Sequence, residues 1–262
     1  MFVDSHCHLS FPELAARIDE IRAAMSAAAV DRALCICTTL EEFDQVHALA
    51  LRYDNFWCSA GVHPDNEGVL EPSVDDLVDL AGQPRVVAIG ETGLDYYRLG
   101  ERSVADMAWQ RDRFRTHIRA ARVTGKPLVI HTRSASEDTL AILREEGGDA
   151  AGGVFHCFTE TMSVARAALD LGFYISFSGI VTFKNATELH EVARFVPLDR
   201  CLIETDSPYL APVPFRGKTN TPALVPHVAA RLAELRGTPI EVIAEATSRN
   251  FDTLFKHSSI AS

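Results

Sequence analysis

Eight short apolar runs, separated by segments with helical periodicity, constrain the fold of this chain more than any other feature. The runs are Phe2–Ser5, Ala33–Thr38, Phe56–Ala60, Val86–Gly90, Leu128–His131, Gly153–His156, Phe173–Phe177 and Cys201–Glu204. Most are continuously apolar rather than alternating, which is typical of parallel strands that are covered on both faces. They predict a parallel sheet whose strands are joined by helical crossovers.

The segments between the runs carry apolar residues at steps of three and four, as one face of a helix requires. The clearest stripes are Leu14, Ile18, Ile21, Met25 and Ala28; Met107, Phe114, Ile118 and Ala121; and Leu224, Val228, Leu232 and Leu235. We expect Ser103 to cap the second helix, and Gly125 and Gly237 to end the second and third. The residues from Thr238 to Glu241 predict a capping box that opens a further helix, with Pro239 in the first helical position.

Strand and helix in eightfold alternation is the pattern of a TIM (β/α)8 barrel. An open doubly wound sheet is the structural rival, but eight strands in 262 residues favour the barrel. No low-complexity linker divides the chain, so we expect residues 1–262 to form a single domain. The one long irregular stretch runs from Ser207 to Pro222, and loops of this length are usually functional or mobile.

Composition narrows the class of protein. The net charge of −11 argues against a broad basic face that coats nucleic acid, although it leaves a local phosphate site open. No run approaches the roughly 18 apolar residues of a membrane span, and the chain opens without a secretory signal. We therefore expect a cytoplasmic protein with no membrane association and no obligate protein partner. Its six cysteines are expected to be reduced, buried packing residues.

Residues with metal-binding chemistry follow the carboxyl ends of most of these runs. In chain order they are His6, His8, His63, Glu91, His131, His156, Glu204 and Asp206. In a barrel these ends converge on one mouth, so residues spread over most of the chain would meet in space. Imidazole and carboxylate groups bind Zn²⁺ and Mn²⁺, and a carboxylate such as Glu91 can bridge two ions. Each residue alone also has a structural explanation, a core histidine or a capping acid, but their shared position favours a metal centre.

Several of these residues suit a phosphodiester substrate. Two ions roughly 3.5–4 Å apart can clamp the attacking and leaving oxygens, and Asp206 can hold an ion and take a proton from water. We expect His63 to contact substrate rather than an ion, since it follows its strand by a few residues. Arg133 fits phosphate binding and a structural ion pair equally well. Arg216 and Lys218, in the proline-rich loop, are the best local basic pair for a polyanion.

The polar motifs also occur in a recognisable order. They read DSHCHL from Asp4, GVHP from Gly61, GETGLD from Gly90, HTR from His131, HCF from His156, ETDSP from Glu204, PFRGKTN from Pro214 and NF from Asn250. This ordered set spans essentially the whole chain and resembles the TatD family of metal-dependent deoxyribonucleases.

The resemblance implies a TIM barrel of the amidohydrolase superfamily with two divalent metal ions. By the family's pattern the ligands would be His6, His8, Glu91, His131, His156 and Asp206. Glu91 would bridge the two ions, and His63 and Glu204 would be close supporting residues. Members of the family are described as Mg²⁺- or Mn²⁺-dependent nucleases, often 3′→5′ exonucleases, and Zn²⁺ is often assigned to the site.

Together these observations predict a divalent-metal-dependent hydrolase that cleaves phosphodiester bonds at DNA ends. Asp206 and Glu91 are its expected catalytic residues, and His63, Arg133, Arg216 and Lys218 its expected substrate-binding residues. A small-molecule amidohydrolase or esterase with the same metal site is the alternative, and a metal-binding protein without catalysis is a third possibility. The ligand types accept several ions, and no residue reports on the 2′-OH that separates RNA from DNA.

Overall fold

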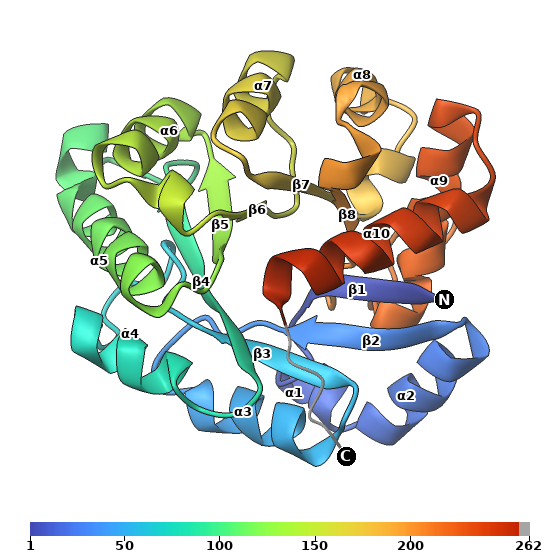
Figure 1. Cartoon of the computed structure of the whole chain (residues 1–262), viewed down its shortest axis with the longest axis horizontal. Coiled ribbons are helices and arrows are strands. Elements are labelled where there is room, and N and C mark those ends of the chain that lie inside the picture. Colours follow the sequence, from blue (N-terminus) through green and yellow to red (C-terminus); the bar gives the residue numbers. More distant parts are fainter. Residues whose placement is uncertain (257–262) are drawn as a thin grey trace.

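The computed structural model describes residues 1–256, in which eight parallel strands form a nearly closed barrel surrounded by helices (Figure 1). The strands are β1 (Phe2–Cys7), β2 (Val30–Cys35), β3 (Phe56–Ala60), β4 (Val86–Asp95), β5 (Leu128–Arg133), β6 (Gly153–Phe155), β7 (Tyr174–Phe177) and β8 (Cys201–Ile203). They pair in the order of the sequence, from β1 to β8. This order confirms the TIM barrel and excludes the doubly wound sheet, whose strand order reverses at a switch point.

The α-helices of the described chain surround the barrel, except the last, α10, which lies across one end of it (Figure 1). They are α1 (Pro12–Ala15), α2 (Ile18–Ala27), α3 (Phe43–Arg52), α4 (Val74–Ala81), α5 (Ala108–Thr124), α6 (Ser136–Glu145), α7 (Met162–Asp170), α8 (Thr187–Phe195), α9 (Val225–Arg236) and α10 (Ile240–Phe255). The 3-10 helices are η1 (Val104–Met107), η2 (Gly148–Ala150), η3 (Gly179–Thr182), η4 (Leu198–Arg200) and η5 (Pro222–Leu224). Helices α5 and α9 end as predicted, at Gly125 and Gly237, whose φ angles of 66° and 63° favour glycine.

The starts of three helices differ from the predictions. The first stripe is divided between α1 and α2 at Arg17, whose φ of −122° and ψ of 21° are not helical. Ser103 precedes η1 rather than α5 itself. The predicted capping box is wrong, because Pro239 is the N-cap of α10 and no side chain caps that helix. The amide of Thr238 instead donates to the carbonyl oxygen of Ala233, which completes the end of α9.

Only β3 has the predicted bounds, and two strands differ from the prediction by three residues or more. Strand β2 begins at Val30, three residues before the predicted start, because Val30 pairs with Phe2 of β1. Strand β4 continues beyond Gly90 to Asp95, so Glu91 lies within the strand. Gly93 makes this extension possible, since a Cβ there would lie 1.9 Å from the carbonyl oxygen of His131 on β5.

One buried hydrophobic cluster takes residues from every strand. Its members on the strands include Val3, Leu34, Trp57, Val87, Val129, Val154, Tyr174 and Leu202. Phe251 and Phe255 of α10 belong to the same cluster, and α10 lies across the barrel in Figure 1. Asn250 fixes the helix there by donating 2.8 Å hydrogen bonds to the carbonyl oxygens of Leu198 and Cys201. Helix α10 therefore closes the amino-terminal end of the barrel, which leaves the opposite end for a site.

The chain after β8 returns to β1 and brings distant residues together. The amide of Asp206 donates to the carbonyl oxygen of His6 (2.9 Å), and the amide of His8 donates to that of Ser207 (2.9 Å). The six cysteines are free and all but Cys157 are buried, in agreement with their predicted packing role. Within residues 1–256, no helix combines the length and the apolar character needed to cross a membrane.

Candidate metal centre

One oxygen of the Glu91 carboxylate faces the two histidines of the first motif. Its Oε2 lies 3.2 Å from Nε2 of His6 and 3.9 Å from Nε2 of His8. The two Nε2 atoms lie 3.3 Å apart, so the rings meet as the two-residue spacing predicts. Asp206 approaches the same pair, with its Oδ1 3.6 Å from Nε2 of His6 and 3.4 Å from Nε2 of His8. These four side chains form one half of the cluster.

The other oxygen of Glu91 faces three further histidines. Its Oε1 lies 3.2 Å from Nε2 of His63, 3.2 Å from Nδ1 of His131 and 2.8 Å from Nε2 of His156. Strands β3, β5 and β6 deliver these rings from their carboxyl ends. The two oxygens of Glu91 therefore face two sets of imidazole nitrogens, and a carboxylate in this position could contribute one ligand atom to each set.

Three groups of donor atoms among residues 1–256 are close enough to hold an ion, with every pair of atoms in a group within 4.8 Å. The groups are His6, His8 and Glu91; His6, His156 and Asp206; and His63, Glu91 and His131. They contain all six ligands implied by the family resemblance. His63, which we expected to contact substrate, also lies in one of them.

Two acids fix the histidine rings from behind. Oδ2 of Asp95 lies 2.9 Å from Nε2 of His131, and its Oδ1 accepts a hydrogen bond from the amide of Tyr97 (2.9 Å). Oε1 of Glu204 lies 3.2 Å from Nδ1 of His156. In each case the ring nitrogen that faces away from Glu91 is engaged, which leaves the other nitrogen free to bind an ion.

Sequence reasoning missed Asp95 and Asp4 as members of the site. Asp95 ends the GETGLD motif, and Asp4 opens the DSHCHL motif, but nothing in the residue types indicated what they contact. Asp4 is fully buried, and burial raises its pKa to about 7. It accepts hydrogen bonds from the amide of Thr205 (2.9 Å) and from the amide of His6 (3.2 Å). Asp4 therefore joins β1 to the segment that carries Asp206.

The charges of the cluster suit cation binding. Burial raises the pKa of Glu91, but the neighbouring histidines outweigh this effect and hold it well below its usual value. Asp206 behaves in the same way, mainly through its hydrogen bond with His8. Burial lowers the pKa of His6 and of His63. Burial acts in the same direction on His8, His131 and His156, but the neighbouring carboxylates outweigh it and raise their pKa. Because ionised carboxylates and neutral imidazoles are the forms that bind metal ions, a bound cation would replace the protons that these three rings attract.

A buried nitrogen without a partner tests whether the residues fit a metal. Nε2 of His156 is buried and makes no hydrogen bond, although it lies 2.8 Å from Oε1 of Glu91. An unsatisfied buried polar atom is costly, and a cation between these groups would satisfy it. Because the donor set is imidazole and carboxylate, the residues present fit a divalent metal ion.

The predicted basic residues lie outside the three ligand groups. Arg133 ends β5 and is exposed, with its guanidinium carbon 3.6 Å from the ring centre of Tyr97. Arg216 lies in the loop after β8, with its guanidinium carbon 4.2 Å from the ring centre of Phe183. Lys218 is exposed in the same loop. The structure thus places Arg133 two residues from His131 and gives each arginine an aromatic support.

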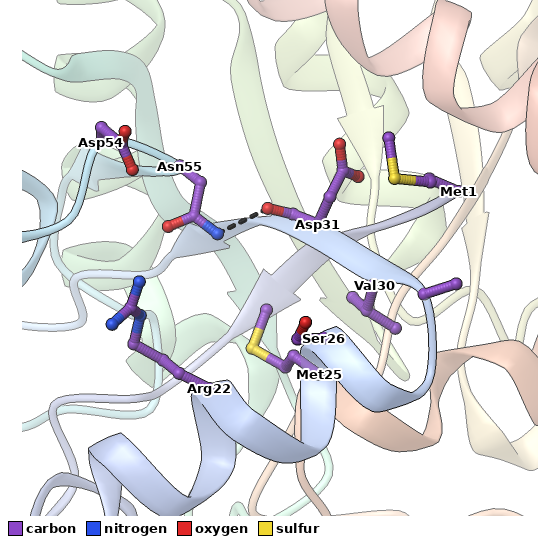
Figure 2. Close-up of a pocket in the computed structure, with 9 residues that line it drawn as sticks. Met1, Arg22, Met25, Ser26, Val30, Asp31, Asp54 and Asn55 are labelled. Carbon is purple, nitrogen blue, oxygen red and sulfur yellow. Dashed lines mark hydrogen bonds between the residues drawn. The ribbon is translucent and has the colours of Figure 1, made fainter.

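A hollow of about 340 Å³ lies at the other end of the barrel (Figure 2). Its lining includes Met1, Arg22, Asp31 and Asn55, which lie before or at the start of the first three strands or on α2. None of the candidate metal ligands lines it. The hollow is therefore separate from the chemistry described above.

Known proteins are similar to this chain over almost its whole length. A family model described as TatD related DNase matches residues 3–256. The chain belongs to the TatD family. It is 50% identical over 257 residues to the metal-dependent hydrolase YcfH of Escherichia coli (strain K12), and the match covers 97% of this chain and 95% of YcfH. It is 34% identical over 259 residues to the 3′-5′ ssDNA/RNA exonuclease TatD of Salmonella typhimurium, which covers 97% of this chain and 98% of that protein.

Solved structures of the TatD family show the same architecture. The crystal structure of YJJV, a TatD homologue from Escherichia coli K12, matches with a TM-score of 0.87 and 29% identity over 98% of both chains. The fold alone is shared with an organophosphorus hydrolase from Deinococcus radiodurans. That structure matches with a TM-score of 0.64 and 17% identity, over 97% of this chain and 92% of the other. The protein is accordingly a metal-dependent hydrolase of the TatD family, with histidines and a glutamate placed to bind metal.

Proposed function

We propose that this protein is a nuclease that uses two divalent metal ions to cleave phosphodiester bonds from the 3′ end of DNA. The observation that carries the proposal is the position of Glu91, whose two oxygens face separate sets of histidines at 2.8–3.9 Å. The description of the matching family supports DNA as the substrate. The name of the Salmonella relative, a 3′-5′ ssDNA/RNA exonuclease, supports a nucleic acid that is cleaved from its 3′ end.

The proposed ligands are His6, His8, Glu91, His131, His156 and Asp206, with Mg²⁺ or Mn²⁺ as the active ions and Zn²⁺ as a further occupant. When bound, such ions neutralise phosphate charge and lower the pKa of water. Asp206 is the carboxylate that solvent reaches, since its side chain is 15% exposed and that of Glu91 is 3% exposed. The neighbouring histidines, above all His8, keep Asp206 ionised despite its burial. We propose that this carboxylate accepts a proton from the attacking water, because solvent reaches it.

The substrate contacts are proposed from the rim of the barrel. Arg133 is supported by Tyr97 and ends the strand that carries His131, so it is placed to bind a phosphate near the ions. Arg216 and Lys218 lie in the loop that follows Asp206, and we propose that they bind phosphates further along the strand. Such a local cationic site is compatible with the net charge of −11, because only a strand end enters the mouth.

A nuclease assay tests the proposal. Purified protein is incubated with 3′-labelled or 5′-labelled single-stranded DNA in Mg²⁺, Mn²⁺ or EDTA. We expect metal-dependent shortening from the 3′ end, and a loss of about 10²–10⁴-fold in rate for Asp206→Asn. Asp138→Asn is the matched control, because Asp138 is a partly exposed carboxylate on α6 that accepts a hydrogen bond from Tyr96 and contacts no proposed ligand.

The assay also separates the alternative. Absence of cleavage with every metal, in protein that still binds the metal, would refute the nuclease proposal. Turnover of amides, esters or small phosphodiesters by the same protein, again lost in Asp206→Asn, would instead support a small-molecule hydrolase with the same centre.

A further inference from the structure

We propose that Tyr209, together with Phe11, forms a stacking platform for a base of the nucleic-acid strand whose phosphate enters the metal centre. The platform would make the enzyme selective for single-stranded ends. This inference rests on the proposed nuclease function, because it requires a nucleic-acid strand in the mouth of the barrel.

Three rings form a corner beside the metal centre. The ring of Phe11 is stacked on the imidazole of His8, with ring centres 4.8 Å apart and planes inclined by 19°. The ring of Tyr209 stands across both, with its centre 6.5 Å from His8 and 6.3 Å from Phe11 at angles of 64° and 75°. Since Nε2 of His8 faces Glu91 and Asp206, the corner directly adjoins the proposed ligands.

Tyr209 is exposed, but its backbone is fixed. Tyr209 is 54% exposed. Its backbone amide donates a hydrogen bond to the carbonyl oxygen of Asp206 (3.0 Å). The buried side chain of Asn220 donates to the carbonyl oxygens of Tyr209 (2.7 Å) and Thr205 (2.9 Å). The amide of Asn220 also donates to the carbonyl oxygen of Pro208 (3.0 Å). The loop therefore fixes the backbone that carries this exposed ring relative to Asp206.

A second exposed tyrosine shows why Tyr209 is the stronger candidate. Tyr97 is 59% exposed, but the guanidinium of Arg133 already lies 3.6 Å from the centre of its ring. One face of Tyr97 is thus occupied, and its contribution is to support Arg133. In the described part of the chain, no cationic side chain lies over the ring of Tyr209.

The chemistry of the corner matches a nucleobase. Stacking on an aromatic ring is tolerant of sequence, because every base has a π-face. It also supplies affinity without positive charge, which suits a protein of net charge −11 that has no broad basic face. Bases inside a duplex are already stacked on their neighbours, so only an unpaired base could use the platform without first breaking a pair.

The test combines ring variants with base-deleted substrates. Single-stranded DNA is prepared intact, with an abasic site at the 3′-terminal nucleotide, or with an abasic site at the nucleotide before it. For the unmodified protein we expect kcat/KM to fall by about 5- to 150-fold for one of the two abasic substrates. Tyr209→Phe keeps the ring and should behave like the unmodified protein.

Tyr209→Ala and Tyr209→Leu remove the ring and should lower kcat/KM on intact DNA by a similar factor. They should no longer distinguish intact from abasic substrate, because the missing base and the missing ring interrupt the same contact. Metal affinity and melting temperature should be close to those of the unmodified protein in all three variants, since the ring is exposed and meets the ligand His8 only through a ring-edge contact. A loss of the same size in Tyr209→Phe as in Tyr209→Ala would overturn the platform.

A binding measurement separates this inference from the proposed function. The affinity of Asp206→Asn for fluorescent single-stranded and duplex DNA is measured in Mg²⁺, with and without Tyr209→Ala. Preference for the single strand that disappears with Tyr209→Ala supports the platform, even if the unmodified protein cleaves no DNA. The platform is overturned if cleavage and binding are the same for intact and abasic DNA and the same with and without the Tyr209 ring. That result leaves the nuclease proposal intact.

Discussion

Replacing Asp95 by Asn tests whether this acid sets the orientation of His131. The carboxylate accepts on both oxygens, from Nε2 of His131 and from the amide of Tyr97, each at 2.9 Å. An asparagine has only one oxygen. If that oxygen stays on Tyr97, the amide NH₂ group points at Nε2 of His131 and favours the tautomer that carries its proton on Nδ1. Nδ1 is the nitrogen that faces Glu91, 3.2 Å from its Oε1.

The expected size of the effect follows from this geometry. Loss of an acid that orients a ligating histidine typically costs 10- to 100-fold in metal affinity, or about 1.4–2.7 kcal/mol. We expect Asp95→Asn to lie near the upper limit, because the substitution both removes a charged partner and favours the wrong tautomer. The measurement is a Mn²⁺ titration followed by calorimetry, with circular dichroism to confirm that the variant is folded.

The control is Asp138→Asn, which replaces a carboxylate that accepts a 2.8 Å hydrogen bond from Tyr96 but contacts no proposed ligand. It should leave Mn²⁺ affinity unchanged. An affinity of folded Asp95→Asn within twofold of the unmodified protein would refute the argument that Asp95 fixes His131 for metal binding.

Three further predictions concern stability. Asn250→Ala removes both hydrogen bonds that fix α10 at the start of β8 and should cost about 2–4 kcal/mol in urea unfolding; a cost below about 1 kcal/mol would contradict its role. Burial lowers the pKa of His117 to about 4, so the unfolded chain takes up a proton first as pH falls. The contribution of neutral His117 to the free energy of unfolding should be fully present above about pH 6.5 and should fall by roughly 3 kcal/mol toward pH 4. In His117→Gln, this part of the pH dependence should be absent. Gly93→Ala places a Cβ 1.9 Å from the carbonyl oxygen of His131, so it should lower the free energy of unfolding by about 1–3 kcal/mol or more and weaken metal binding. Gly172→Ala, whose Cβ would have no atom within 4 Å, should retain metal binding.

The number and order of the strands could be predicted from sequence because they depend on local patterns. Continuous apolar runs such as Phe56–Ala60 are buried on both faces of a parallel sheet, and the structure has that strand with the same bounds. The ends of α5 and α9 were predictable for a similar reason, since Gly125 and Gly237 adopt backbone angles that other residues disfavour. These features need only neighbours in the chain.

The predictions that were wrong depend on competition between adjoining segments. The residues from Thr238 to Glu241 carry the pattern of a capping box, but the amide of Thr238 is used to complete the end of α9. The first apolar stripe continues across Arg17, although the backbone there leaves the helical region. A periodic pattern records which side chains are buried, and it does not record where the backbone breaks between them.

The sequence by itself determined which residue types stand at the ends of the strands, and therefore that imidazoles and carboxylates would meet at one mouth. Only the tertiary structure decided how they meet. The opposite-facing oxygens of Glu91, the contact of Asp95 with His131 and the approach of Asp206 to His8 join residues from different strands. Those contacts depend on the register of β4 against β5 and on the return of the chain from β8 to β1, which packing of the whole barrel sets and no local pattern records.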